Sequence, residues 1–207
     1  MSKKPIIVFE GIEGTGKSHH IKVVSKYLKK KGKGFILIRE PGGSKNSEKI
    51  RRLILNNEST FNKYTDLLLY LSARSENIEL IKKNIGKKII LIDRFTDSTI
   101  AYQHYGMGIN LDFIKNINNF LLKDISIDFT FLNTVSQKNM SKRLIKRKNL
   151  NRYDKFDYKF YNKVQNGFIK ILKKNPKKYI QIDSNLNIEH NEKIILNKIK
   201  DLIWACI

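Results

Sequence analysis

The sequence contains a single cysteine, Cys206, in a chain of 207 residues. One thiol cannot form a disulfide within the chain, so a disulfide-stapled scaffold is excluded and a reducing compartment is expected. Proline is scarce as well, and no stretch rich in proline and serine divides the chain into two parts. We therefore expect one domain, residues 1–207, which is long enough to bury a hydrophobic core.

Long apolar runs are also missing. No segment approaches the roughly 20 apolar residues that a membrane-spanning helix requires. The basic start, residues 1–5, is followed only by the short run Ile6–Phe9 before Glu10, which is too short for the core of a signal peptide. We therefore expect a cytoplasmic protein with no membrane partner.

Acidic residues are few, with 19 Asp and Glu against 41 Lys and Arg, which gives a formal net charge of +22. Such a charge can indicate a nucleic-acid-binding protein. However, Lys, Ile and Asn are abundant together, as AT-rich codons would produce, and the lysines are spread along the chain. Compositional drift is the preferred interpretation, so no specific nucleic-acid partner is expected. Weak, salt-sensitive contact with polyanions stays open as an alternative.

Short β-branched runs alternate with longer segments of helical periodicity. The predicted strands are Ile6–Phe9, Phe35–Ile38, Ile89–Ile92, Ile127–Leu132 and Tyr179–Ile182, and the predicted helices lie near 17–31, 47–56, 63–85, 111–122, 136–147, 155–174 and 188–204. Strands that are apolar throughout are typical of a parallel sheet covered on both faces. The pattern predicts an α/β fold with a doubly wound, five-stranded parallel sheet flanked by helices. Ligands should gather at the carboxyl ends of its strands.

Residues at the helix ends fit this assignment. Ser47 and Ser136 are predicted N-caps, and Gly32 and Gly86 fall where helices should stop. The four histidines show no spacing typical of metal ligands, and we assign none of them a role. Two of these histidines are expected on the surface of the first helix, namely His19 and His20.

One motif between the first strand and the first helix indicates phosphate binding. It matches the pattern G-x-x-x-x-G-K-[ST] and consists of Gly11, Ile12, Glu13, Gly14, Thr15, Gly16, Lys17 and Ser18. Its glycines allow a tight turn whose N–H groups face phosphate oxygens, and the helix N-terminus adds its positive dipole end. Lys17 should reach the β- and γ-phosphates of ATP, and Ser18 should lie beside Mg²⁺.

A second polar pair follows the third predicted strand. Asp93 could hold Mg²⁺ through water, as the acid of a Walker-B strand does, and Arg94 places a cation where a second phosphate would lie. A surface Asp–Arg pair is the alternative. The motif 11–18 alone fits kinases, GTPases, helicases and transport ATPases alike. No guanine-specificity signature of the N-K-x-D kind follows a strand, and the chain is short for the last two classes.

Beyond these motifs, several segments together resemble the bacterial type of thymidylate kinase. They are R-E-P-G-G at 39–43, S-A-R at 72–74, D-R-F-T-D-S-T-I-A-Y-Q at 93–103 and N-R-Y-D at 151–154. Their order and spacing match over nearly the whole chain. The resemblance implies a P-loop NTPase-like fold, usually a homodimer, that uses ATP and Mg²⁺ to convert dTMP into dTDP in dTTP biosynthesis.

The resemblance also implies which residues bind the acceptor phosphate. Arg94 resembles the arginine that holds this phosphate, and Arg51 resembles a second contact. A guanidinium suits this role because its fork binds two phosphate oxygens. Arg39 is expected to help order the loop 39–43, and a structural ion pair with Glu40 or another acid is the alternative.

The same resemblance implies the contacts of the acceptor base and sugar. Tyr70 resembles the aromatic residue that stacks on thymine, although the family more often has phenylalanine there, and Arg74 lies on the same helix face to bond the base. A core aromatic is the alternative for Tyr70. The remaining residues implied in dTMP binding are Glu13, Ser98, Thr99, Tyr102 and Gln103.

The segment 142–154 resembles a lid that supplies the catalytic cation. Arg152 is the first choice for this cation and Arg147 the second, whereas Arg143 is also present in the segment. With Lys17 and Arg94 they complete the expected catalytic residues. Three positions depart from the family pattern, at places that concern the hinge and the hydrogen bonds of the closed lid: Lys148, Asn151 and Asp154.

Three rival functions remain. The first is a nucleotide kinase for another acceptor, such as a deoxynucleoside or a different monophosphate. The second is a basic, nucleic-acid-stimulated ATPase, in which the acceptor residues would have no purpose. The third is a drifted, weakly active kinase kept for another interaction, which only the lid departures support. Phosphoryl transfer to dTMP is the expectation that uses every motif.

Overall fold

The computed structural model describes residues 4–147 and 150–204. Lys148 and Cys206, both considered above, lie outside the described residues. Five strands form one parallel sheet in the order β2-β3-β1-β4-β5. They are β1 (Ile6–Glu10), β2 (Phe35–Arg39), β3 (Ile89–Asp93), β4 (Phe129–Thr134) and β5 (Tyr179–Asp183). The predicted doubly wound α/β architecture is thus confirmed, although the fourth strand begins at Phe129 rather than at Ile127.

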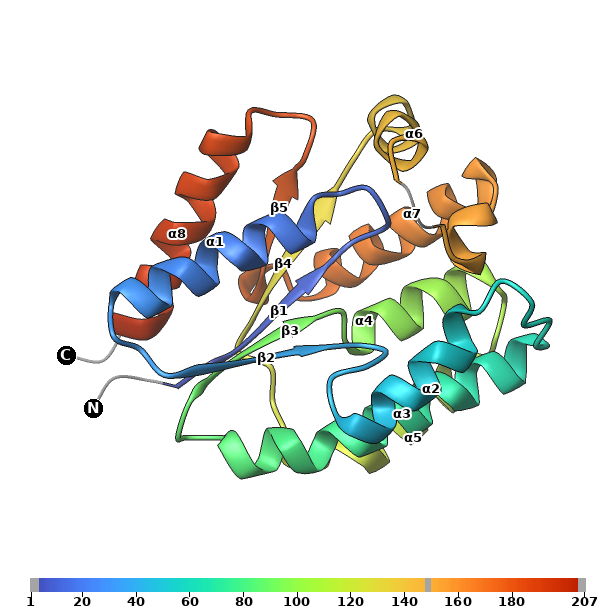
Figure 1. Cartoon of the computed structure of the whole chain (residues 1–207), viewed down its shortest axis with the longest axis horizontal. Coiled ribbons are helices and arrows are strands. Elements are labelled where there is room, and N and C mark those ends of the chain that lie inside the picture. The colour runs from blue at the N-terminus through green and yellow to red at the C-terminus, as the bar shows by residue number, and fades with distance from the viewer. Residues whose placement is uncertain (1–3, 148–149, 205–207) are drawn as a thin grey trace.

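Helices cover both faces of this sheet (Figure 1). The regular helices are α1 (Lys17–Lys30), α2 (Lys45–Leu55), α3 (Lys63–Asn84), α4 (Thr96–Thr99), α5 (Leu111–Leu122), α6 (Gln137–Ile145), α7 (Tyr158–Lys174) and α8 (Ile188–Trp204). The irregular turns are the π-helix η1 (Ile100–Gly106) and the 3₁₀ turns η2 (Arg152–Lys155) and η3 (Pro176–Lys178). Among the residues that are described, no helix has the length and apolar character needed to cross a bilayer.

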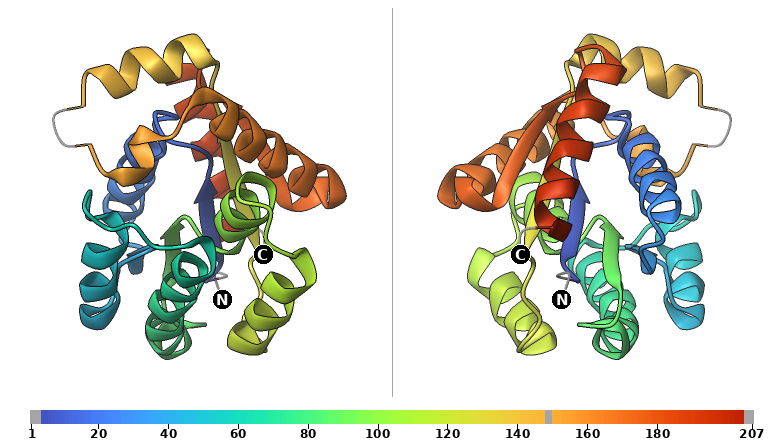
Figure 2. Two further views of the ribbon diagram at one scale, coloured as in Figure 1. Left: turned by 90° about the vertical axis from the view of Figure 1, so that its right-hand side faces the viewer. Right: turned by 90° about the vertical axis from the view of Figure 1, so that its left-hand side faces the viewer.

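Strand residues alternate between two hydrophobic clusters. Ile7 and Phe9 of β1 point to the face covered by α1 and α8, whereas Ile6 and Val8 point to the face covered by α3. All four side chains are buried. Figure 2 shows the two helical layers on either side of the sheet. Burial on both faces explains why these strands are apolar throughout.

The register of the sheet brings three strand ends to one level. Phe9 of β1 and Arg39 of β2 both lie beside Asp93 at the end of β3. Since the strands are parallel, the residues after each of them emerge at the same edge. This edge therefore collects the motif 11–18, the segment 39–43 and the segment that begins at Asp93.

Helix ends follow the sequence in most places. Ser136 caps α6, because its side chain accepts a hydrogen bond from the Asn139 N–H, as predicted. The predicted N-cap Ser47 is wrong. Ser44 caps α2 instead, and its hydroxyl accepts from the Ser47 N–H. Ser47 is buried one turn into the helix and donates to the Gly42 carbonyl at 2.9 Å, which closes the preceding loop.

The helical segment after β3 is missing from the sequence prediction. Residues 96–106 form α4 and then the π-helix η1. A π-helical turn takes more residues than an α-helical turn, so the apolar positions lose the 3.6-residue spacing. The sequence therefore shows binding residues there but no helix. Gly32 and Gly86 do lie just past the ends of α1 and α3, with φ of 60° and 72°, as expected.

Candidate functional site

A cavity of about 470 Å³ lies at the carboxyl edge of the sheet. Its walls come from 13–18, 39–41, 51, 55, 70, 74, 93–95, 98–99, 102–103, 143–144, 147, 151 and 153. Nearly all predicted site residues are among them, although they are far apart in the sequence. Gly11 and Ile12 lie at the start of the phosphate-binding loop without lining the cavity, and Arg152 does not line it either. The sequence missed several wall residues, among them Glu40, Phe95 and Tyr153.

The loop 11–18 has the backbone that a phosphate-binding turn requires. Gly11, Gly14 and Gly16 have φ of 133°, 71° and 79°, values that residues with a side chain rarely adopt. A Cβ at Gly11 would also lie 2.1 Å from the Asn133 carbonyl oxygen, so this position has no room for a side chain. Gly16 then precedes the first turn of α1, where unpaired N–H groups can bind an anion.

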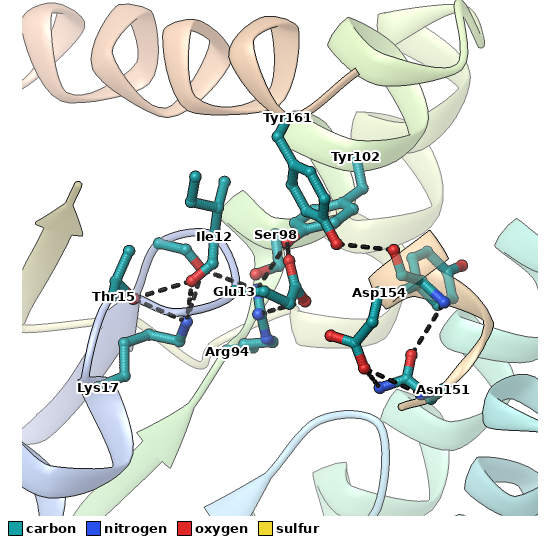
Figure 3. A network of polar contacts seen from close by, with 12 residues as sticks. Ile12, Glu13, Thr15, Lys17, Arg94, Ser98, Tyr102, Asn151, Asp154 and Tyr161 are labelled. Carbon is teal, nitrogen blue, oxygen red and sulfur yellow. Dashed lines mark hydrogen bonds and ion pairs between the residues drawn. The ribbon is translucent and has the colours of Figure 1, made fainter. Parts of the chain in front are cut away.

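Lys17 is held inside this loop. Its ammonium group donates to the Gly11 and Ile12 carbonyl oxygens at 2.7 and 2.8 Å (Figure 3). Burial, aided by the Arg94 cation, lowers the pKa of Lys17 to about 7. A bound polyphosphate would oppose both effects, because an anion near the ammonium favours its charged form.

Arg94, Glu13 and Tyr102 form a polar network across the cavity floor (Figure 3). Arg94 Nη2 lies 2.7 Å from Glu13 Oε1, its Nη1 donates to the Gly11 carbonyl at 2.8 Å, and the Tyr102 hydroxyl donates to Glu13. Burial alone would raise the pKa of Glu13, yet the Arg94 and Lys17 cations lower it. Glu13 thus stays ionised and holds both Arg94 and Tyr102 in place.

Glu10 is a further residue that sequence reasoning did not find. It is fully buried at the end of β1, and its carboxylate accepts hydrogen bonds from the Phe95 N–H at 2.8 Å and from the Ser98 N–H and hydroxyl. Arg94, just before this segment, has φ of 65°, which is strained for a residue with a side chain. Glu10 therefore fixes the backbone that aims Arg94. An acid directly before the phosphate-binding loop was the available signal.

Arg74 is buried at the inner end of the cavity, with only 1% of its surface exposed. Its guanidinium donates to Glu40 at 2.8 Å, to Asn118 at 2.6 Å and to Thr99 at 2.9 Å. Because each of its three nitrogens is bonded, the guanidinium has one orientation and presents a fixed edge to the cavity. Neither Glu40 nor Asn118 was predicted, because each bonds Arg74 from a distant part of the chain.

Gln103 also lines the cavity and is buried. Its side-chain nitrogen, Nε2, has no hydrogen-bond partner within the described part of the chain. A buried donor without a partner costs stability, so its usual explanation is a ligand or a water that accepts from it. A ligand with a carbonyl group at this end of the cavity would satisfy Gln103.

The other predicted acceptor residues also line the cavity. Arg39 forms a two-pronged ion pair with Glu48, at 3.0 and 2.9 Å, and Glu48 also accepts from the Gly43 N–H. Arg39 thus forms the alternative expected for it, a structural ion pair, with Glu48 rather than Glu40, and Glu48 links this pair to the loop 39–43. Arg51 donates to the Pro41 carbonyl, and the Tyr70 ring meets the Tyr153 ring edge-on with centroids 5.9 Å apart.

The two lid arginines differ in direction. Arg147 lines the cavity and bonds the Asp154 carboxylate at 2.7 Å. Arg152, the first choice from sequence, donates to the Asp66 carboxylate and to the Ile54 carbonyl. Arg152 thus packs against α2 and α3, away from the cavity walls.

The unusual lid residues Asn151 and Asp154 form a hydrogen-bonded pair with each other. Asp154 accepts from the Asn151 N–H and side-chain amide at 2.9 and 2.7 Å, and Asn151 accepts from the Tyr153 N–H. This is a capping box that closes the turn η2. These two departures from the family pattern therefore keep the turn intact.

A smaller cavity of about 230 Å³ adjoins the phosphate-binding loop. Its walls include Thr15, Gly16, His20, Arg143 and Leu186. The expected surface position of His20 is wrong. Only 4% of this residue is exposed, it is paired with Asn133 at 2.8 Å, and burial lowers its pKa to about 4. His19 does lie on the surface, next to Glu192.

Two further contacts close the smaller cavity. Arg143 donates to the Gly14 carbonyl at 2.8 Å and to the Ser184 carbonyl at 2.7 Å. It therefore ties the lid helix α6 to the phosphate-binding loop and to the loop after β5. Thr15, Gly16 and Arg143 line both cavities, so one extended ligand could occupy the smaller cavity and reach the larger with its phosphates.

Together these features define a P-loop phosphotransferase of the nucleotide kinase class, because a phosphate-binding loop and a set of arginines from other elements line one cavity. The thymidylate kinase family model matches residues 9–195. The chain belongs to the thymidylate kinase family. It is accordingly a nucleoside monophosphate kinase, a transferase that phosphorylates dTMP in dTTP synthesis.

Individual thymidylate kinases are similar to this chain over most of its length. A thymidylate kinase of Thermoanaerobacter sp. (strain X514) is 34% identical over 96% of this chain and 98% of its own length. One from Thermosipho africanus (strain TCF52B) is 39% identical over 89% and 92%. The crystal structure of thymidylate kinase from Ehrlichia chaffeensis matches with a TM-score of 0.78 and 30% identity, covering 96% of this chain and 99% of that one.

Proposed function

We propose that this chain transfers the γ-phosphoryl group of ATP to the phosphate of dTMP in the larger cavity, giving dTDP and ADP. The observation that carries the proposal is the arrangement of cations around one cleft. Lys17 lies on the donor side, Arg94 on the acceptor side, and the lid arginine Arg147 lines the same cavity. Since the acceptor phosphate oxygen is already nucleophilic, the reaction needs position and charge neutralisation rather than a protein base.

The loop 11–18 is proposed as the donor-phosphate site. The open N–H groups at the start of α1 and the buried Lys17 ammonium support this role. The smaller cavity beside the loop would receive the nucleoside of ATP, because it opens next to Thr15 and Gly16. Arg143 would contact that nucleoside from the lid side.

The acceptor phosphate is assigned to Arg94 and Arg51, with Arg39 ordering the adjacent loop. Arg94 and Arg51 line the cavity from different elements, and a guanidinium can bind two oxygens of a dianionic phosphate. Glu13 and Tyr102 would lie against the acceptor sugar, because they meet directly beside Arg94.

The thymine base is assigned to the pocket end formed by Tyr70, Arg74, Ser98, Thr99 and Gln103. Tyr70 offers an aromatic face at the cavity wall. Arg74 and Gln103 offer hydrogen-bond donors, and the unpartnered Gln103 nitrogen fits a base that carries carbonyl groups. Such donors suit the carbonyl oxygens of thymine better than the amino group of cytosine or adenine.

The residues present also fit Mg²⁺ bound together with ATP. Asp93 and Ser18 line the cavity, and the Asp93 carboxylate makes no hydrogen bond or ion pair within residues 4–147 and 150–204. In that same part of the chain, no cluster of three metal-binding side chains exists. Mg²⁺ commonly takes one carboxylate, waters and substrate phosphates, so this sparse donor set suits it. When bound, the ion would neutralise phosphate charge.

Arg147 is proposed as the catalytic cation of the lid, ahead of Arg152. The contact of Arg147 with the cavity supports this order, because the cation must approach the phosphate in transfer. Arg152 is bonded to Asp66 and to the Ile54 carbonyl instead. Lid closure would exclude water and limit the loss of ATP to hydrolysis.

A homodimer in the cytoplasm completes the proposal. Large apolar side chains are exposed on the adjacent helices α3 and α5, among them Leu68, Phe113 and Phe120. Exposed apolar side chains on neighbouring helices are typical of a subunit interface. Analytical ultracentrifugation would test the assembly state. A cytoplasmic location agrees with the pools of ATP and dTMP that the reaction uses.

An acceptor panel tests the proposed function directly. The purified chain would be assayed with ATP and Mg²⁺ against dTMP, dUMP, dCMP, dGMP, dAMP and thymidine. We expect dTMP to have the highest kcat/KM and thymidine to be inactive, because it lacks the phosphate that Arg94 and Arg51 bind. Preference for another acceptor would contradict the base assignment. ATP hydrolysis stimulated by DNA, without transfer to dTMP, would contradict the function itself.

A further inference from the structure

Asp66 is a buried acid on α3 that the proposed reaction does not use. Only 1% of the residue is exposed, and it does not line either cavity. Its carboxylate accepts hydrogen bonds from two neighbours in the turn η2, the Arg152 guanidinium and the Tyr153 hydroxyl. Arg152 also donates to the Ile54 carbonyl of α2. The turn η2 is thus fastened to both helices that carry acceptor residues.

The other side of the same turn faces the cavity. The Tyr153 ring meets the Tyr70 ring at 84°, and the Tyr161 hydroxyl donates to the Tyr153 carbonyl at 2.6 Å. The next residue, Asp154, bonds the Arg147 guanidinium at 2.7 Å. A short series of contacts therefore runs from Asp66 through Arg152 and Tyr153 to Arg147.

The charges along this series make Asp66 the point where it is fixed. The Asp66 side chain is 2% exposed and the Arg152 side chain 15%, so the ion pair lies in a poorly hydrated place. The Arg147 side chain is 47% exposed, and it is anchored by its ion pair with Asp154, whose own side chain is fully buried. Removing one partner of a buried pair leaves an uncompensated charge, which costs far more than breaking an exposed pair. The Asp66–Arg152 pair, in which both side chains are largely buried, therefore fixes the turn η2, whereas the half-exposed Arg147 depends on the turn for its position.

We propose that Asp66 is a positioning residue of the phosphoryl transfer. With Arg152 it fixes the turn η2 on α3, and the turn in turn directs Arg147 into the cavity beside Tyr70. This inference rests on the proposed function, since it needs Arg147 to act on the transferred phosphate. Arg152 then serves the reaction through its ion pair rather than by touching the substrate.

A double-mutant cycle between Asp66 and Arg147 tests the proposal. Asp66→Asn keeps the size of the side chain and an acceptor for Tyr153 but removes the charge that holds Arg152. We expect kcat to fall about tenfold to 100-fold, because small misplacement of a catalytic group has effects of this size. The KM for ATP should change by less than about threefold, because no donor-side residue touches Asp66.

The decisive result is the same substitution in the Arg147→Ala background. There Asp66→Asn should lower kcat by no more than about twofold, because the group that it positions is gone. If the kcat losses of the two single variants multiply in the double variant, the proposal is overturned. An unchanged kcat in the single Asp66→Asn variant would also overturn it. Glu79→Gln is the matched control, since this acid lies on the same helix with 81% of its side chain exposed.

A second variant keeps the test valid if Asp66→Asn does not fold stably. If Asp66→Asn lowers the melting temperature into the assay range, Arg152→Gln takes its place, because Arg152 is less buried. Arg152→Lys should retain most of kcat, since an ammonium keeps the ion pair with Asp66. A lysine variant as poor as the glutamine variant would overturn the ion-pair role. If wild type and Glu79→Gln yield no dTDP, the proposed function fails. If these enzymes are active and the kcat losses of the two single variants multiply in the double variant, only the positioning role of Asp66 is rejected.

Discussion

The strand-end part of the cavity and the lid part are built in different ways. At the strand ends, Arg74 and Arg94 are held by buried partners and approach the cavity from fixed backbone positions. In the lid, Arg147 extends from the end of α6 and has one ion pair, with Asp154. We propose that the first part binds a substrate in a preformed shape and that the second adjusts around it. We therefore assign substrate binding to the strand ends and transition-state stabilisation to the lid.

The largest effect is expected from Arg94→Ala, which changes the strand-end part of the cavity. The substitution removes the proposed phosphate contact and leaves Glu13 buried without its cation, so kcat/KM for dTMP should fall about 10³-fold, mostly through KM. Steady-state kinetics with varied dTMP measure this. Arg52→Ala on the exposed side of α2 is the control. Unaltered acceptor kinetics would exclude Arg94 as the phosphate contact.

Arg147→Ala changes the lid part of the cavity. Because the cation acts on the transferred group, kcat should fall about 10²- to 10³-fold with little change in the KM for dTMP. Arg152→Ala should lower kcat less, since Arg147 remains. Parallel kinetics of the two variants measure the order. A larger loss of kcat for Arg152→Ala would restore Arg152 as the catalytic cation.

Glu10→Gln sharpens the account of why the strand ends are rigid. Glutamine retains one acceptor but loses the charge that strengthens the bonds to Phe95 and Ser98, so Arg94 should be aimed less well. We expect kcat/KM for dTMP to fall about tenfold. The Glu79→Gln variant again serves as the control. A variant with wild-type acceptor kinetics would show that Arg94 keeps its backbone position without Glu10.

The smallest effect concerns stability. Burial, with the Glu10 carboxylate nearby, raises the pKa of Asp97 to about 7 in the folded chain, well above its ordinary value. Between the unfolded and folded pKa values the native state holds a proton that the unfolded state lacks. The free energy of unfolding should therefore fall as pH rises from 5 to 7, by about 1.4 kcal/mol per pH unit at most from this group.

Asp97→Asn should flatten that dependence, because the amide does not titrate and can still accept the hydrogen bond from the Tyr179 hydroxyl. Urea unfolding at several pH values measures the slope. Asp201→Asn, at an exposed position of α8, should leave it unchanged. An equal slope in wild type and Asp97→Asn would mean that Asp97 is ionised throughout this range.

Several site residues of the strand-end part could be placed together from the sequence. Lys17 begins the helix after β1, Asp93 ends β3 and Arg94 follows it. Because parallel strands bring their ends to one edge, sequence order was enough to place these residues together. Tyr70 and Arg74 share a helix face, and the helical period predicted that pairing. Such residues are fixed by local geometry and by the sheet order.

Other features depend on direction and distant contacts, which spacing does not encode. Arg147 and Arg152 lie in one short segment, and only the position of Asp66 on α3 shows which of them is turned from the cavity. Glu10 and Asn118 act through bonds to residues far along the chain. The π-helix after β3 has no apolar period to reveal it.

A single-turnover experiment with [γ-³²P]ATP, together with dTMP binding, tests the division between the two parts most directly. We predict a crossover. Arg147→Ala should bind dTMP as wild type does but transfer the label about 10²-fold or more slowly. Arg94→Ala should bind dTMP far more weakly, and at saturating dTMP it should transfer the label faster than Arg147→Ala does. Loss of the same parameter in both variants would contradict the account.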